Sequence, residues 1–345
     1  MNKCYTFLRR SMLVFFLLIV STLAIKAQYF GQNKVRYNNE KFKVLQTPHF
    51  EIYYYLQNEK LIAKFAEDAE TWYKMHQEIF KATFEKKNPI IFYNNHPDFQ
   101  QTTALQGDIG IGTGGVTEAF KNRVIMPVME LNNQTRHVLG HELVHAFQYH
   151  LLLEKDSISL ENISQIPLWM IEGMAEYLSV GKNDAFTSMW MRDALLNRDI
   201  PSLKDLTNSN KYFPYRYGQA FWTFVGSVYG DTTIVPLFKA TARFGYENGL
   251  RYTFGYDDRA LSGLWKNAIE THYRPMLKAD SSQIRITGTK IIDNKNAGNM
   301  NVAPAISPDG KYLAFLSEKD LFGLDLFLPD AKTGKILKKN SSQVS

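Results

Sequence analysis

The chain has 345 residues, of which 45% are hydrophobic and 21% charged, and its net charge is +6. This composition is typical of a globular protein with a large core and excludes a disordered chain. The basic residues are scattered, without a lysine- or arginine-rich tract that alternates with aromatic residues. The sequence therefore gives no support to a nucleic-acid-binding function.

The first 27 residues have the pattern of a secretory signal peptide. Lys3, Arg9 and Arg10 form a basic start, and the apolar run SMLVFFLLIVSTLAI follows. We expect cleavage between Ala27 and Gln28, and export to the periplasm or the extracellular space. The alternative is an uncleaved membrane anchor, but the run is shorter than the roughly 20 residues that a spanning helix needs.

Cleavage would remove the single cysteine of the chain, Cys4. Cys4 precedes the apolar run, so it is not placed to be lipidated at the cleavage site. The mature chain would then contain neither a disulfide nor a thiolate that binds a metal or attacks a substrate.

The region up to residue 128 predicts a small sheet with one long helix. The stretch 42–56 is rich in aromatic and β-branched residues and is divided by Pro48, which predicts two short strands. Apolar residues at helical spacing predict an amphipathic helix over 59–80. Further strands are predicted over PIIFYNN, from residue 89, and over 116–120 and 123–128.

Helices are predicted from residue 133 to about residue 276. Residues 133–153 have helical periodicity, and 167–181 begin with proline and end with glycine, an asymmetry typical of helices. The segments 182–199 and 217–230 are also predicted to be helical. Strands that come first and helices that follow predict an α+β domain over residues 28–280.

The sequence changes character after residue 280. Residues 281–300 are polar and are predicted to be a linker. Residues 301–345 contain short strands separated by SPDG and TGK turns, which predicts one β-meander. A single meander of this size does not bury both of its own faces. It would therefore pack on the preceding domain or begin a longer array.

The segment HELVHAFQYH, which begins at His141, predicts a metal site. Residues four apart in a helix lie on one face, so His141 and His145 present two imidazoles to one ion. Glu142 lies beside them and would act as the base, and then the acid, for a metal-activated water. Two imidazoles and a carboxylate suit zinc, although nickel or cobalt can occupy such a site in vitro.

The helix over 167–181 offers a third ligand. Glu172 and Glu176 lie one turn apart on a mostly apolar helix, and such carboxylates need a cation or histidines opposite them. Glu172 is predicted as the third ligand of one zinc ion, and Glu176 as the acceptor of the N–H of a ligating histidine. The alternative is that both glutamates are exposed on the surface.

These motifs resemble the gluzincin metallopeptidases. HELVH followed by WMIEGMAEY is similar to the thermolysin and aminopeptidase N type of zinc hydrolase, whose third ligand is a glutamate on the next helix. The resemblance implies His141, His145 and Glu172 as zinc ligands, Glu142 as the base and Glu176 as the supporting acid. YFGQNKVRY, TPHFEIYYY and SPDGKYLAFLS resemble secreted bacterial peptidase-MA-like proteins joined to TolB-type β-propeller repeats, so residues 301–345 would begin a propeller.

Three further features are weaker candidates. Gluzincins often stabilise the oxyanion with a tyrosine or a histidine, and of Tyr215 and Tyr217 we prefer Tyr217. His137 precedes His141 by one turn and either supports the site or is a surface or core histidine. A G-x-G-x-x-G pattern from Gly110 lacks the strand and helix of a dinucleotide site. Instead, we expect an edge strand that binds an extended peptide, formed by Gly114, Gly115, Val116, Thr117 and Glu118.

The sequence thus predicts an exported zinc-dependent peptidase. One alternative is a binding protein with a silent zinc site whose propeller docks a protein partner. The other is a zinc hydrolase that acts on a non-peptide substrate, because the motif indicates a metal and a base but not the acyl group.

Overall fold

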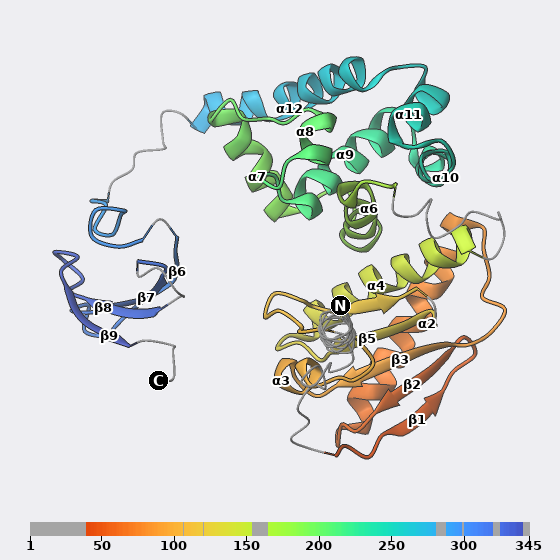
Figure 1. Ribbon diagram of the computed structural model, residues 1–345, viewed down its shortest axis with the longest axis horizontal. Helices are drawn as coiled ribbons and strands as arrows, with labels where there is room; N and C mark the ends of the chain where they lie inside the picture. The colour runs from red at the N-terminus through yellow and green to blue at the C-terminus, as the bar shows by residue number, and fades with distance from the viewer. Residues whose placement is uncertain are drawn as a thin grey trace, which may run out of the picture. The chain divides into compact units, whose positions relative to one another are not determined.

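The computed structural model describes residues 39–105, 107–119, 121–153, 165–280, 288–298, 300–319 and 325–340. Contacts divide the chain into two units, residues 1–276 and 277–345, and each is described by itself (Figure 1). The predicted signal peptide and part of the predicted linker lie outside the described residues. No described helix is both long enough and apolar enough to cross a membrane.

The first unit opens with a five-stranded mixed sheet in the order β1-β2-β3-β5-β4. The central strand β3 pairs in parallel with β2 and β5, while β1 and β4 pair antiparallel at the two edges. The strands are β1 (Lys43–Gln46), β2 (Phe50–Tyr54), β3 (Asn88–Tyr93), β4 (Val116–Glu118) and β5 (Arg123–Pro127). The predicted division of the first two strands around Pro48 is confirmed.

The two faces of this sheet are covered differently. Alternate side chains of a strand point to opposite faces, and in β3 Ile90 and Phe92 join the main core with the long helices. Those helices are α2 (Glu59–Phe80) and α4 (Asn132–Leu153), which pack on each other. Ile91 and Tyr93 join a smaller cluster that includes Phe99 of the short helix α3 (His96–Gln100).

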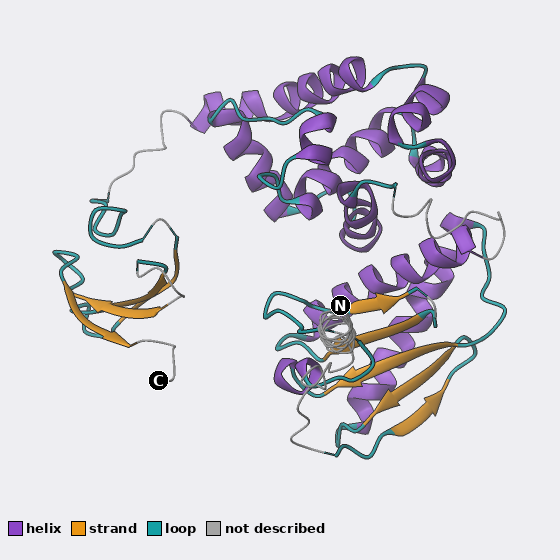
Figure 2. Cartoon of the chain, in the orientation of Figure 1, coloured by secondary structure: helices purple, strands orange, loops and turns teal. Residues whose placement is uncertain are grey.

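The rest of the first unit is helical, as Figure 2 shows. The described helices are α6 (Leu168–Val180), α7 (Ala185–Leu196), α8 (Leu203–Asn208), α9 (Pro214–Val228), the 3-10 turn η2 (Asp231–Thr233), α10 (Ile234–Phe244), α11 (Tyr246–Phe254) and α12 (Asp258–Asp280). The predicted α+β class is confirmed. Helices α3 and α8 were not predicted, because five or six residues are too few to establish helical periodicity.

Helices α6 and α9 cross closely because each contributes a glycine at the crossing. A Cβ on Gly173 would overlap the backbone of Gly218, and a Cβ on Gly218 would overlap the carbonyl of Trp169. Trp222 of α9 also donates its indole N–H to the carbonyl of Met170 at 3.0 Å. The crossing thus fixes the rotation of α6, and this rotation decides where its glutamates point.

The second unit contains an open antiparallel sheet in the order β6-β7-β8-β9. Its strands are β6 (Asn301–Ile306), β7 (Leu313–Ser317), β8 (Asp325–Pro329) and β9 (Ile336–Asn340). Phe315, Phe327 and Ala297 form its small buried core. The predicted meander is confirmed. The predicted propeller is not shown, because the described strands form one open sheet and no closed array.

Candidate metal centre

Helices α4 and α6 bring three potential metal ligands together. His141 Nε2 lies 3.1 Å from His145 Nε2 and 3.1 Å from Glu172 Oε2, and His145 Nε2 lies 3.3 Å from the same oxygen. All three side chains are at least 85% buried. Three polar atoms that form so tight a triangle away from water need protons or a cation between them.

The size of the triangle fits a tetrahedral zinc ion. Zinc binds histidine nitrogen and carboxylate oxygen at about 2.0–2.1 Å, so neighbouring ligands of a tetrahedron lie about 3.3 Å apart. The three observed separations are 3.1, 3.1 and 3.3 Å. The donor set of two imidazoles and one carboxylate also suits zinc. The residues therefore fit one zinc ion with a fourth position free.

The other ring nitrogen of each histidine faces an oxygen acceptor. His145 Nδ1 lies 2.8 Å from Gln148 Oε1, and Gln148 in turn donates its amide to the carbonyl of Ile171 at 3.2 Å. His141 Nδ1 lies 3.1 Å from Glu176 Oε1 in a bent contact. An acceptor at Nδ1 favours the tautomer that carries its proton there, which leaves Nε2 with a lone pair for a metal.

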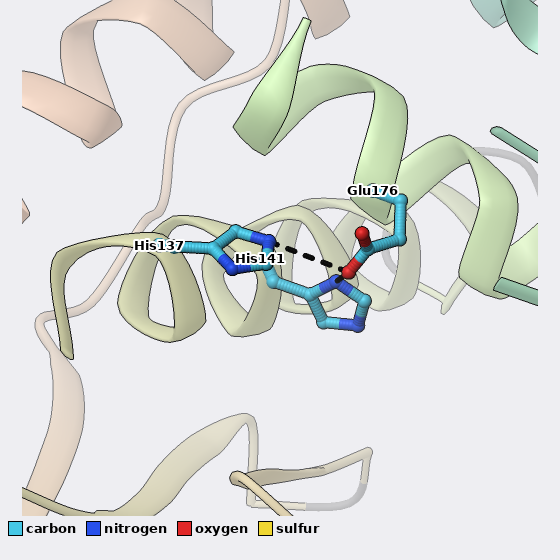
Figure 3. A group of neighbouring side chains, drawn as sticks. All are labelled: His137, His141 and Glu176. Carbon is cyan, nitrogen blue, oxygen red and sulfur yellow. Dashed lines mark ion pairs between the residues drawn. The ribbon is translucent and has the colours of Figure 1, made fainter. Parts of the chain in front are cut away.

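Glu176 is itself held from several directions. Figure 3 shows that His137 and His141, one turn apart on α4, both face its carboxylate. His137 Nε2 lies 3.3 Å from Oε1. On the other side Arg216 Nη1 donates to Oε2 at 3.0 Å and to Asp184 Oδ2 at 3.2 Å.

His137, His141 and Glu176 also satisfy the spacing of a metal-binding group. Two observations argue that this group supports the first one and does not bind a second ion. It would use the Nδ1 of His141, whose ring already presents Nε2 to the first group. The guanidinium of Arg216 also lies 3.0 Å from the same carboxylate, and its positive charge opposes a second cation there.

The charges of this cluster reinforce one another. Burial would lower the pKa of His141, but the carboxylates of Glu172 and Glu176 outweigh it and raise the pKa to about 10. Burial would likewise raise the pKa of both glutamates, but the facing histidines hold each well below its usual range. The carboxylates are thus ionised at neutral pH, and a metal would compete with protons for the histidines.

Glu142 is positioned by the edge strand β4. Thr117 Oγ1 lies 2.7 Å from Glu142 Oε2 and 2.9 Å from the backbone oxygen of the same residue. A Cβ on Gly115 would come within 2.9 Å of Glu142 Cγ and Oε1. The absence of a side chain at position 115 therefore leaves room for the glutamate. The predicted segment from Gly114 to Glu118 thus includes an edge strand that contacts the predicted base.

The two candidate tyrosines lie in different surroundings, and Tyr217, the one preferred from the sequence, is not the one beside His141. The Tyr217 ring packs on Trp190 and Tyr212, with centroids 6.0 and 5.4 Å away. Burial raises its pKa to about 12, and of the nearby charges Asp199 adds most to this effect. Residues two apart in a helix do not share a face, so α9 cannot present both tyrosines to the cluster.

Of the two candidates, Tyr215 lies at the cluster. Its ring stacks on His141 with centroids 5.8 Å apart and planes 17° apart. Burial, followed by the charges of Glu172 and Glu142, raises its pKa well above the usual value. The phenol therefore remains protonated at neutral pH and can donate a hydrogen bond beside the three ligands.

The sequence did not reveal three supporting contacts. Thr117 contacts Glu142, Gln148 contacts His145, and Arg216 contacts Glu176. Gln148 had a local signal, because it follows His145 by three residues on the same helix. Arg216 reaches Glu176 from 40 residues away, and Thr117 reaches Glu142 across 25 residues. Neither of these two pairs has a spacing that a sequence pattern reveals.

A comparison with protein families shows to which superfamily the chain belongs. The sequence profile of the Peptidase MA superfamily matches residues 71–271, more than half of the chain. The chain belongs to the Peptidase MA superfamily. The matched region begins within α2 and ends within α12. It contains the five site residues predicted from the HELVH and WMIEGMAEY motifs, which are His141, Glu142, His145, Glu172 and Glu176. Membership supports a metallopeptidase-like domain and a peptide or protein substrate. A search of curated proteins found no match.

Proposed function

We propose that this protein is a zinc-dependent peptidase of the gluzincin type that hydrolyses peptide bonds. The observation that carries the proposal is the triangle formed by His141, His145 and Glu172, which has the size of a tetrahedral zinc site and lies beside Glu142. When bound, zinc supplies a Lewis acid that polarises the scissile carbonyl and acidifies the attacking water.

Glu142 is the proposed proton carrier. Thr117 holds its Oε2, and Oε1 then accepts the proton of the attacking water and passes it to the leaving amine. The carboxylate neighbours His141 closely enough for its charge to raise the pKa of that ring. One side chain would thus serve as base and then as acid without changing its position.

The edge strand β4 is the proposed binding element for the substrate backbone. Edge strands present N–H and C=O groups along one side, and an extended peptide can pair with them as an additional strand. Because Thr117 of β4 contacts Glu142, a peptide paired with this strand would pass close to the base. Gly114 and Gly115, directly before β4, let the peptide backbone approach closely.

Tyr215 is the proposed donor to the oxyanion. Its hydroxyl stays protonated, and its ring stacks on a ligating histidine. A donor already fixed at this position would stabilise negative charge that develops on the carbonyl oxygen in the transition state.

We also propose that the peptidase is exported through the signal peptide of residues 1–27. The basic and apolar pattern of this segment supports export to the periplasm or the extracellular space. The open meander of β6 to β9 supports a role for residues 301–345 as one blade of a TolB-type propeller, a fold that offers a surface for a protein partner.

The test is cleavage of a mixed peptide library by purified wild-type protein and by Glu142→Gln, with bound zinc measured in both. We expect the variant to keep one zinc ion and to lose activity by a factor of about 10² to 10⁴, the usual contribution of a positioned acid–base group. Chelation of the metal should abolish wild-type cleavage, and added zinc should restore it.

The matched control is Glu130→Gln, which makes the same change at an exposed glutamate just before α4 and should cleave like wild type. If all three proteins hold one zinc ion and none cleaves any peptide, the peptidase proposal is wrong. A zinc protein that binds a partner, or one that hydrolyses another substrate, would then be the better description.

A further inference from the structure

Four large apolar side chains are exposed beside one another on α7 and directly before α9. Trp190 is 36% exposed and Phe213 is 43% exposed, and Phe186 and Met189 are more exposed still. Met189 and Trp190 follow Phe186 by three and four residues, so the three side chains share one face of α7. The ring centroid of Phe213 lies 5.7 Å from that of Trp190. These four residues are called the apolar strip below.

The apolar strip continues into the candidate metal centre through a chain of ring contacts. Phe213 stacks on Tyr215 with centroids 5.1 Å apart and planes 27° apart. Tyr215 in turn stacks on His141, a predicted zinc ligand, at 5.8 Å. Two short ring-to-ring steps therefore join Trp190 to Tyr215. An extended peptide rises about 3.3 Å per residue and covers these two steps in about three residues.

The contacts that hold Glu176 also hold the beginning of the strip. Arg216 donates to Glu176 and to Asp184. Asp184 caps α7 by accepting from the backbone N–H of Thr187 at 2.6 Å. The guanidinium of Arg216 also lies over the ring of Phe186, 5.7 Å from its centroid. The strip is thus fixed relative to the metal centre and does not depend on a free loop.

A contiguous apolar surface beside a peptidase site indicates where part of the substrate binds. Apolar side chains that are exposed singly are ordinary, whereas a contiguous group marks a place where apolar surface is buried on binding. The strip begins one ring away from Tyr215, and membership of the Peptidase MA superfamily supports a peptide or protein substrate. Aromatic and long aliphatic side chains of a peptide bury the largest apolar area against such a surface.

We propose that the apolar strip is a subsite that selects peptides with a large apolar side chain about two to four residues from the cleaved bond. This inference rests on the proposed peptidase function. A subsite at this distance engages only a chain that continues well beyond the cleaved bond. The substrates are therefore long peptides or unfolded protein segments, and not dipeptides.

Trp190 offers a readout of binding that does not need turnover, because each of the other four tryptophans is at most 8% exposed. The zinc-loaded Glu142→Gln protein is titrated with the neutral peptide GSGSFSGSG and with a control peptide that has serine in place of the phenylalanine. The phenylalanine peptide should protect tryptophan fluorescence from quenching by iodide. It should bind about tenfold more tightly than the control peptide, because one aromatic ring is partly buried.

Two variants and a control locate this binding. Phe213→Ser and Met189→Ser, made in the Glu142→Gln protein, should each weaken binding of the phenylalanine peptide by about fivefold and leave the control peptide unaffected. Both positions are exposed, so the fold should tolerate these changes. Tyr252→Ser removes an aromatic ring that is 76% exposed on α11, and this variant should bind both peptides like its parent.

Cleavage of a mixed peptide library separates this proposal from the peptidase proposal. Bonds cut by the wild type should have a large apolar residue enriched about two to four positions away, and Phe213→Ser should lose this enrichment. The subsite is overturned if the two peptides bind equally, if iodide quenching stays unchanged, or if the cut bonds lack the enrichment. If the wild type cuts nothing but the phenylalanine peptide still protects Trp190, the peptidase proposal fails and the strip remains a binding site for apolar peptide segments.

Discussion

Helix α4 packs against α2 and α6, and a buried histidine lies at each of these two contacts. His76 of α2 lies at the first contact and His141 of α4 at the second, and their pKa values are shifted in opposite directions. On the side of α2, His76 Nε2 donates to the carbonyl of Gly140 at 3.1 Å, and burial lowers the pKa of His76 to about 4. On the side of α6, burial acts on His141 in the same direction, but Glu172 and Glu176 raise its pKa to about 10. Burial is common to both, so the partners make the difference.

The two contacts also differ in how closely the helices pack. At the contact between α2 and α4, a Cβ on Gly140 would come within 2.5 Å of the ring of Trp72, and this ring stacks on His76. Trp72 donates to the carbonyl of Arg136 at 3.0 Å. Neutral donors that bind backbone carbonyls fix the helix in place. The contact between α4 and α6 adds a cluster of facing histidines and carboxylates, which prepares a place for a cation.

The largest expected effect comes from removing the charge on the side of α6. Glu172→Gln keeps the size of the side chain but replaces the ionised ligand by a neutral amide. We expect zinc affinity to fall by more than the roughly 10- to 100-fold that follows loss of a residue supporting a ligand. Competition with a chelating dye measures this affinity. Glu130→Gln should bind zinc like wild type, and a Glu172→Gln protein whose affinity stays within tenfold of wild type would contradict the ligand assignment.

For the contact between α4 and α6, the sequence alone predicted those features that depend on spacing within one helix. His141 and His145 lie four apart on α4, and Glu172 and Glu176 lie four apart on α6, so each pair shares a helix face. The sequence could not show that the two faces meet. This depends on the rotation of α6, which the close approach of Gly173 and Gly218 fixes.

The sequence could not show which tyrosine lies beside His141, for the same physical reason. Both candidate tyrosines lie in the first turn of α9, and the sequence gives no measure of how that helix is rotated about its axis. The rotation that brings Tyr215 onto His141 sends Tyr217 toward Trp190. Arg216, between them, reaches Glu176 and Asp184. Three consecutive residues thus serve three different contacts, and long-range packing assigns each of them.

The other side of α4 is tested by the pH dependence of stability. His76 has a pKa of about 4 in the folded protein and about 6.5 when unfolded. Only the unfolded chain therefore binds this proton between pH 6.5 and 4, so His76 costs stability as the pH falls through that range. The expected loss is about 3 kcal/mol, and none of it is present above pH 6.5.

His76→Gln isolates this contribution, because glutamine keeps an N–H donor for Gly140 but does not titrate in this range. Urea unfolding of the metal-free wild type and variant should be compared at pH 7, 5.5 and 4. Other groups titrate in both proteins and cancel in the difference. The variant should gain on wild type by about 3 kcal/mol as the pH falls from 7 to 4. Parallel pH profiles would show that the buried ring can take up a proton after all.

The smallest expected effect tests whether the contact between α4 and α6 depends on a third helix. Arg216 of α9 donates to Glu176 and to Asp184 through one nitrogen, and Glu176 faces Nδ1 of His141. Arg216→Lys keeps the charge but loses the rigid planar fork. We expect zinc affinity to fall by about tenfold, the lower end of the range for residues that support a ligand.

Zinc competition and kinetics of the zinc-saturated enzyme separate the two ways in which this arginine can act. If Arg216 orients Glu176, zinc affinity falls while kcat at saturating zinc stays close to wild type, because Arg216 does not contact the ligands directly. Arg243→Lys, at an exposed position on α10, should change neither quantity. Unchanged zinc affinity in Arg216→Lys would mean that His137 and His141 suffice to orient Glu176. The chemistry on this side of α4 would then depend on two helices and not on three.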